Sequence, residues 1–499
     1  TEFDVPQFQA GKRATILFDG AMSHANVYIN GQKVGYWPYG YNSFHFDITK
    51  YLKPGEKNTL AVRLENLPES SRWYPGAGLY RNVHLIITED AYIPVWGTYI
   101  TTPSVNEKFA KVNVRTKVVL PEGADPAKYS VETSVWNPNK QKLTAVRTSL
   151  AQMKYNNNQA EQEFVIQAPS LWSPEMPALY SAETRLYEGD KLKDIYTTPF
   201  GIRSIEIIPD KGFFLNGKRT VFKGVCNHHD LGPLGAAVND AAIRRQIRIL
   251  KDMGCNAIRT SHNMPAPELI RACDEMGMMI MAESFDEWNV AKCKNGYNLL
   301  FDEWAEKDLV NLLHNFRNNP SVVMWCIGNE VPNQWNEGDC KIAKGLQDIC
   351  HREDPTRPVT QGMDAPDAVV NNNFAAVMDV AGFNYRPFKY KINYKKLPQR
   401  IVLGSETAST VSSRGVYKFP VERKAMAKYD DHQASSYDVE HCGWSNLPED
   451  DFIQHEDLPY CIGEFVWTGF DYLGEPTPYY TDWPSHSSLF GIIDLAGIP

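Results

Sequence analysis

The sequence predicts two antiparallel β-sandwiches followed by a closed (β/α)8 barrel. Three observations support this prediction. Residues 1–200 consist of short β-rich runs separated by turn signals such as Asn30-Gly31, which is typical of antiparallel sheets. After residue 205 the pattern changes, and apolar runs alternate with segments of helical periodicity. At 499 residues, the chain has room for two to four domains of roughly 100–200 residues each.

The two sandwiches are predicted at residues 1–102 and 103–203. The β-rich runs of the first are Arg13–Phe18, Ala25–Ile29, Leu60–Leu64 and Val83–Ile87. Those of the second are Lys111–Leu120, Tyr129–Trp136 and Ala160–Ile166. The second segment has the length of an immunoglobulin-like domain, about 100 residues, so we expect an immunoglobulin-like β-sandwich there.

Residues 204–499 are predicted to form the barrel. Eight short apolar runs are expected to be its strands: Val221–Val225, Cys255–Arg259, Met278–Ala282, Val322–Ile327, Pro358–Gln361, Val377–Phe383, Ile401–Ser405 and Ile462–Trp467. Helical segments such as Asp240–Met253 and Pro267–Met276 separate them. Alternation of this kind indicates parallel βαβ units, and eight units indicate a closed barrel.

Composition excludes several classes of function. The net charge of -9 argues against a nucleic-acid partner, whose phosphates would be repelled. No apolar run reaches the length of about 18 residues that a membrane span needs. The nine cysteines include no Cys-x-x-Cys pair, so we expect buried free thiols rather than a zinc ribbon. The 12 Trp, 25 Tyr and 22 Phe suit sugar recognition, because an aromatic face can pack against a pyranose.

Two glutamates end buried strands at the same rim of the predicted barrel. Glu330 follows the fourth strand in the segment Gly328-Asn329-Glu330, and Glu406 ends the seventh. In barrels of this type the carboxyl ends of the strands carry the chemistry. Strands four and seven lie on opposite sides of the barrel mouth, so the two carboxylates are expected to face each other across a cleft. Glycoside hydrolysis requires such a pair.

At this point the chain resembles glycoside hydrolase family 2, the family of β-galactosidases, β-glucuronidases and β-mannosidases. Gly328-Asn329-Glu330 is similar to the family's acid/base motif. Other matches are Ser71–Arg81 with the sugar-binding sandwich signature, Leu171–Pro174 and Phe200–Arg203 with the end of the second sandwich, and Lys223–His228 and Asn256–His262 with the first two barrel strands. The resemblance implies a sugar-binding jelly roll at residues 1–102 and a TIM-barrel catalytic domain at 204–499.

The resemblance also implies a retaining mechanism with Glu330 as acid/base and Glu406 as nucleophile. Because the nucleophile must be ionised, we expect Arg259 to pair with Glu406. Asn329 is expected to bind the sugar 2-hydroxyl. Tyr385 resembles the family tyrosine that contacts the nucleophile, with core packing as the alternative.

Further rim residues are expected to bind the sugar. His228 and His262 could face one pyranose, although His228-His229-Asp230 could instead bind a metal. Trp467 resembles the tryptophan that floors the sugar pocket, with rim packing as the alternative.

An acidic group after the third strand consists of Glu283, Asp286 and Glu287. Asp286 is expected to bind sugar hydroxyls, and a salt-bridged loop is the alternative. Glu464 is expected to pair with Arg259 or another base without acting in catalysis. The family's metal-binding element is not matched by Glu287-Trp288-Asn289. We therefore expect no metal site and no required cofactor, while a structural or modulating cation stays open.

The expected function is that of a retaining, exo-acting glycoside hydrolase. Ser405–Ser409 and Ser412–Tyr417 resemble bacterial β-galactosidases most. β-Glucuronidase and β-mannosidase are the alternatives within the family, and a non-catalytic carbohydrate-binding protein is the alternative from another class. The expected partner is a carbohydrate substrate, with a homo-oligomer left open and the bacterial periplasm or cytoplasm as the expected location.

Two departures from the family concern the ends of the chain. The first 100 residues offer fewer strands than the family's first domain, and the eighth barrel helix is expected after Asp494. The sequence is therefore expected to be an internal fragment, and the isolated 1–499 polypeptide is expected to have low stability.

Overall fold

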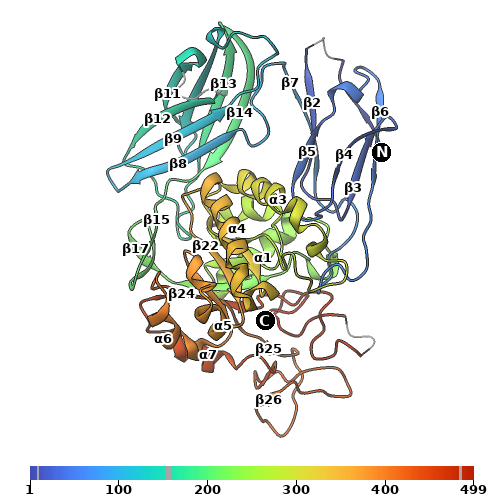
Figure 1. Cartoon of the computed structure of the whole chain (residues 1–499), viewed down its shortest axis with the longest axis vertical. Helices are drawn as coiled ribbons and strands as arrows, with labels where there is room; N and C mark the ends of the chain where they lie inside the picture. Colours follow the sequence, from blue (N-terminus) through green and yellow to red (C-terminus); the bar gives the residue numbers. More distant parts are fainter. Residues whose placement is uncertain (8–10, 153–158, 483–485) are drawn as a thin grey trace.

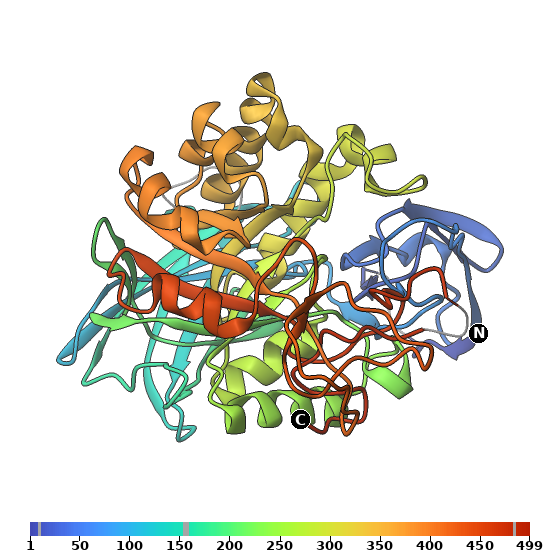
Figure 2. The same cartoon turned by 90° about the horizontal axis from the view of Figure 1, so that it is seen from below.

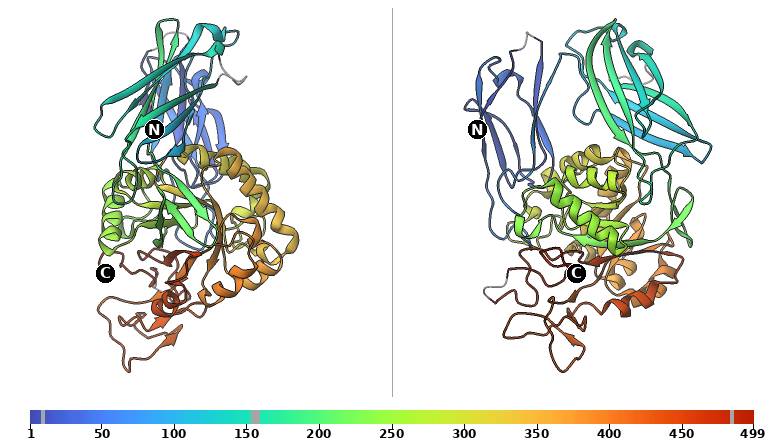
Figure 3. Two further views of the ribbon diagram at one scale, coloured as in Figure 1. Left: turned by 90° about the vertical axis from the view of Figure 1, so that its left-hand side faces the viewer. Right: turned by 180° about the vertical axis from the view of Figure 1, so that it is seen from behind.

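The computed structural model describes residues 1–7, 11–152, 159–482 and 486–499. Two β-sandwiches stand side by side above the barrel in the view of Figure 1. The segment between the last two barrel strands, coloured orange to red, lies on the side of the barrel away from them (Figures 2 and 3). This arrangement confirms the predicted combination of two sandwiches and a TIM barrel.

The first sandwich is built from two sheets with the strand orders β1-β6-β3-β4 and β5-β2-β7. The strands are β1 Glu2–Asp4, β2 Arg13–Phe18, β3 Ala25–Ile29, β4 Gln32–Trp37, β5 Phe44–Asp47, β6 Lys57–Arg63 and β7 Val83–Thr88. Alternate residues of β3 point inward, so Ala25, Val27 and Ile29 are fully buried in the core.

The second sandwich has the sheets β11-β10-β13-β14 and β12-β9-β8. Its strands are β8 Thr98–Val105, β9 Phe109–Lys117, β10 Tyr129–Trp136, β11 Lys142–Ser149, β12 Gln159–Gln167, β13 Tyr180–Glu188 and β14 Lys191–Phe200. Strand β8 begins at Thr98 and ends at Val105, so the boundary predicted between residues 102 and 103 lies within this strand. Val112 and Val114 of one sheet pack in the core with Val135 of the other. A small sheet of β15 Ile205–Ile208, β16 Gly212–Leu215 and β17 Lys218–Thr220 leads into the barrel.

Eight parallel strands close the barrel in the order β18-β19-β20-β21-β22-β23-β24-β28. They are β18 Phe222–Asn227, β19 Ala257–Thr260, β20 Met279–Glu283, β21 Val322–Asn329, β22 Val359–Met363, β23 Ala381–Asn384, β24 Val402–Ala408 and β28 Cys461–Trp467. The sixth strand begins later than predicted, at Ala381, because Val377 ends a 3-10 turn and residues 378–380 form a bend. All eight residues of β21 are buried, as expected for a strand covered on both faces.

The helices between these strands are α1 Asp240–Met253, α2 Pro267–Met276, α3 Phe301–Phe316, α4 Cys340–Glu353, α5 Pro366–Asn371, α6 Tyr390–Asn393 and α7 Pro448–His455. In α1, the Asn239 side chain caps the first turn, and Gly254 ends the helix in the left-handed region at φ 100°. After the seventh strand, short strands β25 Thr410–Val411, β26 Lys424–Ala425 and β27 Glu440–His441 form a separate small sheet.

Buried polar contacts fix the sandwiches to the barrel. Arg81 of the first sandwich donates to the carbonyl oxygens of Met264 (2.9 Å) and Pro265 (3.2 Å). The indole nitrogen of Trp172 in the second sandwich donates to the Asp274 carbonyl at 2.9 Å, and its side chain is fully buried. Because these contacts are out of solvent, the loops of the first sandwich are held at a fixed position beside the barrel mouth.

Two sequence predictions concern the cysteines and membrane-spanning segments. The nine cysteines are free thiols, and six of them are buried. Within the described residues, no helix combines the length and apolar character needed to cross a bilayer.

Candidate active site

Glu406 lies near the carboxyl end of β24 and is 4% exposed. Arg259 Nη1 donates to Glu406 Oε2 at 2.9 Å, which is the pairing expected from the sequence. The Tyr385 hydroxyl donates to Glu406 Oε1 at 2.6 Å. Asn384 Nδ2 also reaches Glu406 Oε2, at 3.4 Å. Both oxygens of this carboxylate are therefore held by donors that come from β19 and from the end of β23.

Arg259 is fully buried, and its own orientation is fixed. Its Nε donates to Glu283 Oε2 at 2.6 Å, and its Nη2 donates to Asn329 Oδ1 at 2.8 Å. Its Nη1 also donates to the Ser405 carbonyl at 2.8 Å. A guanidinium held at three nitrogens presents a rigid donor to Glu406.

Glu330 is the first residue after β21 and has a φ of 44°, in the left-handed region. Such a conformation is uncommon for a residue with a side chain, and it is typical of functional sites. The Glu330 amide donates to the Gly362 carbonyl at 2.8 Å, which holds the turn. Asn384 Nδ2 donates to Glu330 Oε1 at 2.9 Å.

One amide nitrogen, Asn384 Nδ2, thus contacts both carboxylates. The separation of Glu330 Oε1 and Glu406 Oε2 cannot exceed the sum of these two contact distances, 2.9 and 3.4 Å. That limit concerns one oxygen of each carboxylate, and it is compatible with the carboxyl spacing of about 5–5.5 Å found in retaining glycosidases. The geometry therefore allows direct attack by one carboxylate.

The ionisation of Glu406 differs from the sequence expectation. Burial, and then the nearby Glu330 carboxylate, raise the pKa of Glu406 to about 8, although Arg259 and Tyr385 act to lower it. Pairing with Arg259 alone does not decide its charge. Within the described residues three donors point at Glu406 and only Asn384 points at Glu330, so hydrogen bonding favours the ionised form of Glu406 against the effect of burial.

The aromatic residues predicted at the rim come together. Trp467 stacks on His262 with ring centroids 5.0 Å apart and planes 7° apart. His228 meets Trp467 edge-on at 5.3 Å and lies 4.1 Å from the Tyr472 ring. Among the described residues, neither buried ring nitrogen of His228 has a hydrogen-bond partner. Burial lowers the pKa of His228 well below its usual value, so a neutral imidazole is available to a ligand.

Asp286 takes part in a salt-bridged cluster, as the alternative interpretation of this acidic group proposed. Its Oδ1 accepts from Arg72 Nη2 at 2.8 Å, from Lys292 Nζ at 2.7 Å and from Asn329 Nδ2 at 3.1 Å. Burial opposes its ionisation, but the charges of Arg72 and Lys292 outweigh that effect and keep the pKa of Asp286 well below its usual range. The cluster joins a loop of the first sandwich to the barrel rim.

Several site residues were missed by sequence reasoning. Arg72 and Trp73 were read only as part of a sandwich signature, yet the Trp73 ring lies 4.8 Å from His228 and 5.8 Å from His262. Asn384, which precedes Tyr385, was not predicted as a site residue. Its position at the end of a barrel strand was the one available signal. Lys292 lies in a loop, and nothing in the sequence pattern marked it.

Of the two kinds of partner predicted for Glu464, the structure shows another base and not Arg259. The Glu464 carboxylate lies 3.3 Å from His455 Nε2 and accepts from Thr407 Oγ1 at 2.6 Å. Glu464 is partly exposed within β28, and its neighbours come from β24 and α7, so its side chain points away from the barrel interior.

The three consecutive residues considered as a metal site diverge. His229 Nε2 lies 3.0 Å from the Pro75 carbonyl, and Asp230 accepts from the Gly232 amide. Across the described ranges, no group of three or more His, Cys, Asp or Glu side chains is arranged to hold a metal ion.

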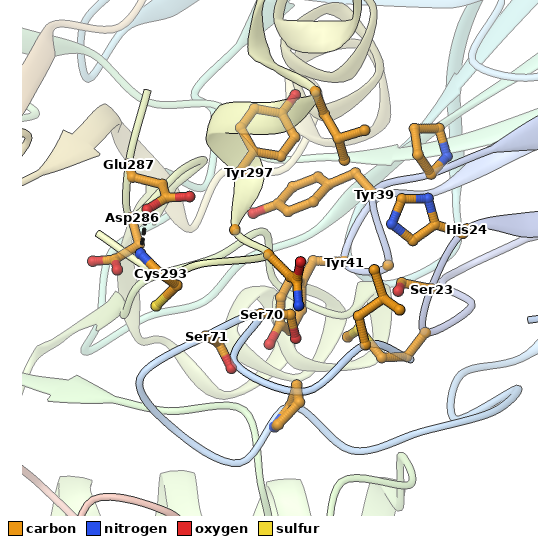
Figure 4. Close-up of a pocket in the computed structure, with 18 of the residues that line it drawn as sticks. Ser23, His24, Tyr39, Tyr41, Ser70, Ser71, Asp286, Glu287, Cys293 and Tyr297 are labelled. Atoms are coloured by element: carbon orange, nitrogen blue, oxygen red, sulfur yellow. Dashed lines mark hydrogen bonds between the residues drawn. The ribbon is translucent and has the colours of Figure 1, made fainter. Parts of the chain in front are cut away.

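A pocket at the seam between the first sandwich and the barrel adjoins this site (Figure 4). Tyr39 and Tyr41 of the sandwich line it together with Tyr297 of the barrel, and His262 and Asp286 belong to both the pocket and the site. The first sandwich therefore forms part of the wall around the barrel mouth.

Comparison with known families gives three consecutive matches. Residues 1–89 match the sugar-binding domain of glycosyl hydrolases family 2, residues 92–203 match the family's second domain model, and residues 206–480 match its TIM-barrel domain. The β-galactosidase BoGH2A of Bacteroides ovatus is 40% identical over the whole chain, which covers 63% of that relative. A putative β-glucuronidase of Formosa agariphila is 32% identical over 99% of the chain, which covers 48% of that relative.

Solved structures agree in fold. A family 2 member from Bacteroides cellulosilyticus matches with a TM-score of 0.87 and 33% identity, and a β-glycosidase from Bacteroides vulgatus with 0.88 and 32%. The chain is covered completely in both and spans 60% and 65% of their lengths. Thus the chain spans less than two thirds of the length of each of these relatives. Its domain order, barrel and sequence show that it belongs to glycoside hydrolase family 2.

Proposed function

We propose that this protein is a retaining, exo-acting β-glycosidase in which Glu406 is the nucleophile and Glu330 is the acid/base. The observation that carries the proposal is that one nitrogen, Asn384 Nδ2, donates to both carboxylates, while Arg259 and Tyr385 both donate to Glu406. A carboxylate with both oxygens held is oriented for attack, and a partner within reach of the same nitrogen can protonate the leaving group.

The reaction would proceed in two steps. In the first, an oxygen of ionised Glu406 forms a bond to the anomeric carbon while the bond to the aglycone oxygen breaks, and Glu330 gives its proton to that oxygen. The ester formed at Glu406 is neutral, so the electrostatic penalty on an ionised Glu330 disappears and its carboxylate can act as base. In the second step, Glu330 takes a proton from water, the water oxygen attacks the anomeric carbon, and Glu406 leaves.

The sugar would lie against the aromatic wall of the site. The stacked pair of Trp467 and His262 offers a flat surface for the pyranose, and the free ring nitrogens of His228 can bind hydroxyl groups. The Asn329 amide lies between Asp286 and Arg259, where it can reach a hydroxyl beside the anomeric carbon. The first-sandwich loop that carries Arg72 closes one side of the mouth, which suits a terminal sugar.

A neutral sugar fits the charges at the barrel mouth better than a uronic acid does, and galactose is the first candidate. Arg72 and Lys292 reach this region as cations, but Asp286 already pairs with both. Glu475 adds a carboxylate 4.0 Å from Arg72. A substrate carboxylate would have to compete with these groups. The 40% identity to a β-galactosidase points the same way, and β-glucuronidase and β-mannosidase remain the alternatives.

A panel of nitrophenyl β-glycosides tests this function. We expect release of nitrophenol from the β-galactoside at a higher kcat/KM than from the β-glucuronide or β-mannoside. Glu406→Gln should abolish turnover. Glu464→Gln is the matched control, because that glutamate lies on the next strand and points away from the barrel interior. Binding of galactosides without hydrolysis of any substrate in the panel would favour the non-catalytic carbohydrate-binding alternative.

A further inference from the structure

A groove of about 970 Å³ lies between the second sandwich and the barrel. Its walls come from strands β8 and β9, from the chain between β14 and β15, and from the carboxyl-terminal ends of helices α3 and α4. These helix ends lead into the starts of barrel strands, so the groove is at the amino-terminal end of the barrel, beneath the second sandwich in Figure 1. Glu330 and Glu406 lie at the opposite end.

Cations predominate among the charged residues that line the groove. The cationic residues are Arg115, Lys117, Arg203, Arg317, Arg352 and Arg357, and the carboxylates are Glu161, Glu206 and Glu353. The whole chain has a net charge of -9, so the lining of the groove is more positive than the molecule. Some of these cations are paired: Arg357 with Asp354 at 2.6 Å, Arg352 with Glu306 at 2.9 Å and Arg115 with Glu161 at 4.0 Å. A cleft lined by one sign of charge concentrates ligands of the other sign.

Part of this positive charge has no carboxylate partner. Arg203 is buried and donates to the carbonyl oxygens of Pro320 (2.7 Å) and Val322 (2.9 Å), which are neutral. Arg317 has only a long ion pair, with Nη1 4.0 Å from Glu353 Oε2, and its Nε is buried without a hydrogen-bond partner among the described residues. Lys117 lies on the exposed side of β9, and within the described ranges no ion pair forms at its ammonium. An anion entering the groove would compensate these charges.

Aromatic rings accompany the cations. Trp96 and His45 line the groove and meet edge-on with ring centroids 5.4 Å apart. The Arg317 guanidinium lies 4.5 Å from the centre of the Tyr99 ring, which fixes its plane. A guanidinium is suited to a carboxylate or sulfate, and an indole face suits the C–H face of a sugar.

We propose that this groove is a second carbohydrate-binding site, which takes an acidic oligosaccharide. Its uronate or sulfate groups pair with Arg115, Lys117 and Arg317, and one of its sugar rings packs on Trp96. The site holds the acidic part of a glycan at the end of the barrel opposite Glu330 and Glu406. It requires no catalytic residue, so it stands independently of the proposed glycosidase function.

Calorimetric titration of the full chain tests the proposal with an oligogalacturonide, a sulfated galacto-oligosaccharide and an uncharged galacto-oligosaccharide of equal length. At least one acidic ligand should bind with an affinity that falls as salt rises, and it should not inhibit the hydrolysis of a nitrophenyl galactoside competitively. The double variant Arg115→Gln/Lys117→Gln should weaken this binding at least tenfold, and Trp96→Ala should weaken it as well.

The matched control is Lys142→Gln/Lys191→Gln, which removes two exposed cations from the other sheet of the same sandwich. It should leave the affinity unchanged. Equal loss in the two double variants, or unchanged affinity in Arg115→Gln/Lys117→Gln, would overturn the proposal. Equal binding of a polyglutamate of the same charge would also overturn it, because the groove would then recognise charge without sugar. The titration needs no turnover, so its outcome is separate from the test of hydrolysis.

Discussion

Arg259 Nη1 donates to Glu406 Oε2 at 2.9 Å in a site where the arginine is fully buried and the glutamate nearly so. The same guanidinium is held by Glu283 and Asn329. A buried cation with two carboxylate neighbours is compensated for its loss of hydration. It therefore serves both to orient Glu406 and to favour the ionised form of that carboxylate against the effect of burial.

The pH dependence of kcat/KM should report this balance. The pKa of Glu406 is raised to about 8 by burial and by Glu330, and the nucleophile must be ionised, so kcat/KM should rise as pH rises through that value. In Arg259→Gln, a cation that lowers this pKa is removed, so this limb of the profile should move to higher pH. The value of kcat should drop about 10²–10³-fold. Arg259→Lys keeps the charge and should show a smaller shift of the limb; an unchanged limb in Arg259→Gln would contradict the account.

Tyr385→Phe should lower kcat/KM by about 10- to 100-fold, because a hydrogen bond to a charged group contributes about 1.5–3 kcal/mol. The Tyr385 hydroxyl donates to Glu406 at 2.6 Å, so the loss should appear mainly in kcat. Tyr390→Phe is the matched control, since the Tyr390 hydroxyl is buried without a hydrogen-bond partner in the described part of the chain. Steady-state kinetics that show equal effects of the two substitutions would exclude a role for Tyr385 in holding the nucleophile.

Asp308 should make the docking of the first sandwich dependent on pH. Its carboxylate, on α3, accepts from Trp37 Nε1 at 2.8 Å and from Asn42 Nδ2 at 2.7 Å, both in the first sandwich. Burial raises its pKa to about 7. The folded state therefore binds the proton more tightly than the unfolded state, and the stabilisation present below about pH 4 is lost as pH rises to about 7.

The Asp308 carboxyl should change the free energy of unfolding by about 1.4 kcal/mol per pH unit between about pH 4 and about pH 7, and this dependence should be absent in Asp308→Asn. Urea unfolding at pH 5 and pH 8 measures it as the difference between wild type and variant. Asp302→Asn, an exposed position on the same helix, is the control and should follow the wild type. If Asp308→Asn also follows the wild type at both values of pH, the carboxyl does not titrate on unfolding as described.

The sequence was most informative where periodicity and strand ends decide the structure. All eight barrel strands could be located because buried parallel strands are short apolar runs, and Glu330 and Glu406 could be placed because each ends such a run. Contacts between distant segments were harder to predict. Arg72 reaches Asp286 from 214 residues away, and no local pattern encodes that distance in space.

Side-chain direction was the second limit. Glu464 was expected to pair with Arg259 or another base, and its side chain turns toward Thr407 and His455 rather than toward Arg259. Because successive residues of a strand point to opposite sides, an error of one residue in register reverses the prediction. The raised pKa of Glu406 likewise depends on three-dimensional burial, which the pairing with Arg259 alone did not reveal.

Azide rescue of the two glutamate variants tests the central claim most directly. With Glu406→Ala, azide should attack from the vacated side of the sugar and give the α-glycosyl azide, while Glu330→Ala should give the β-glycosyl azide on substrates with good leaving groups. NMR of the anomeric proton in each product distinguishes the two configurations. The account predicts the α-azide from Glu406→Ala alone; the α-azide from Glu330→Ala, with the β-azide from Glu406→Ala, would show that the two roles are reversed.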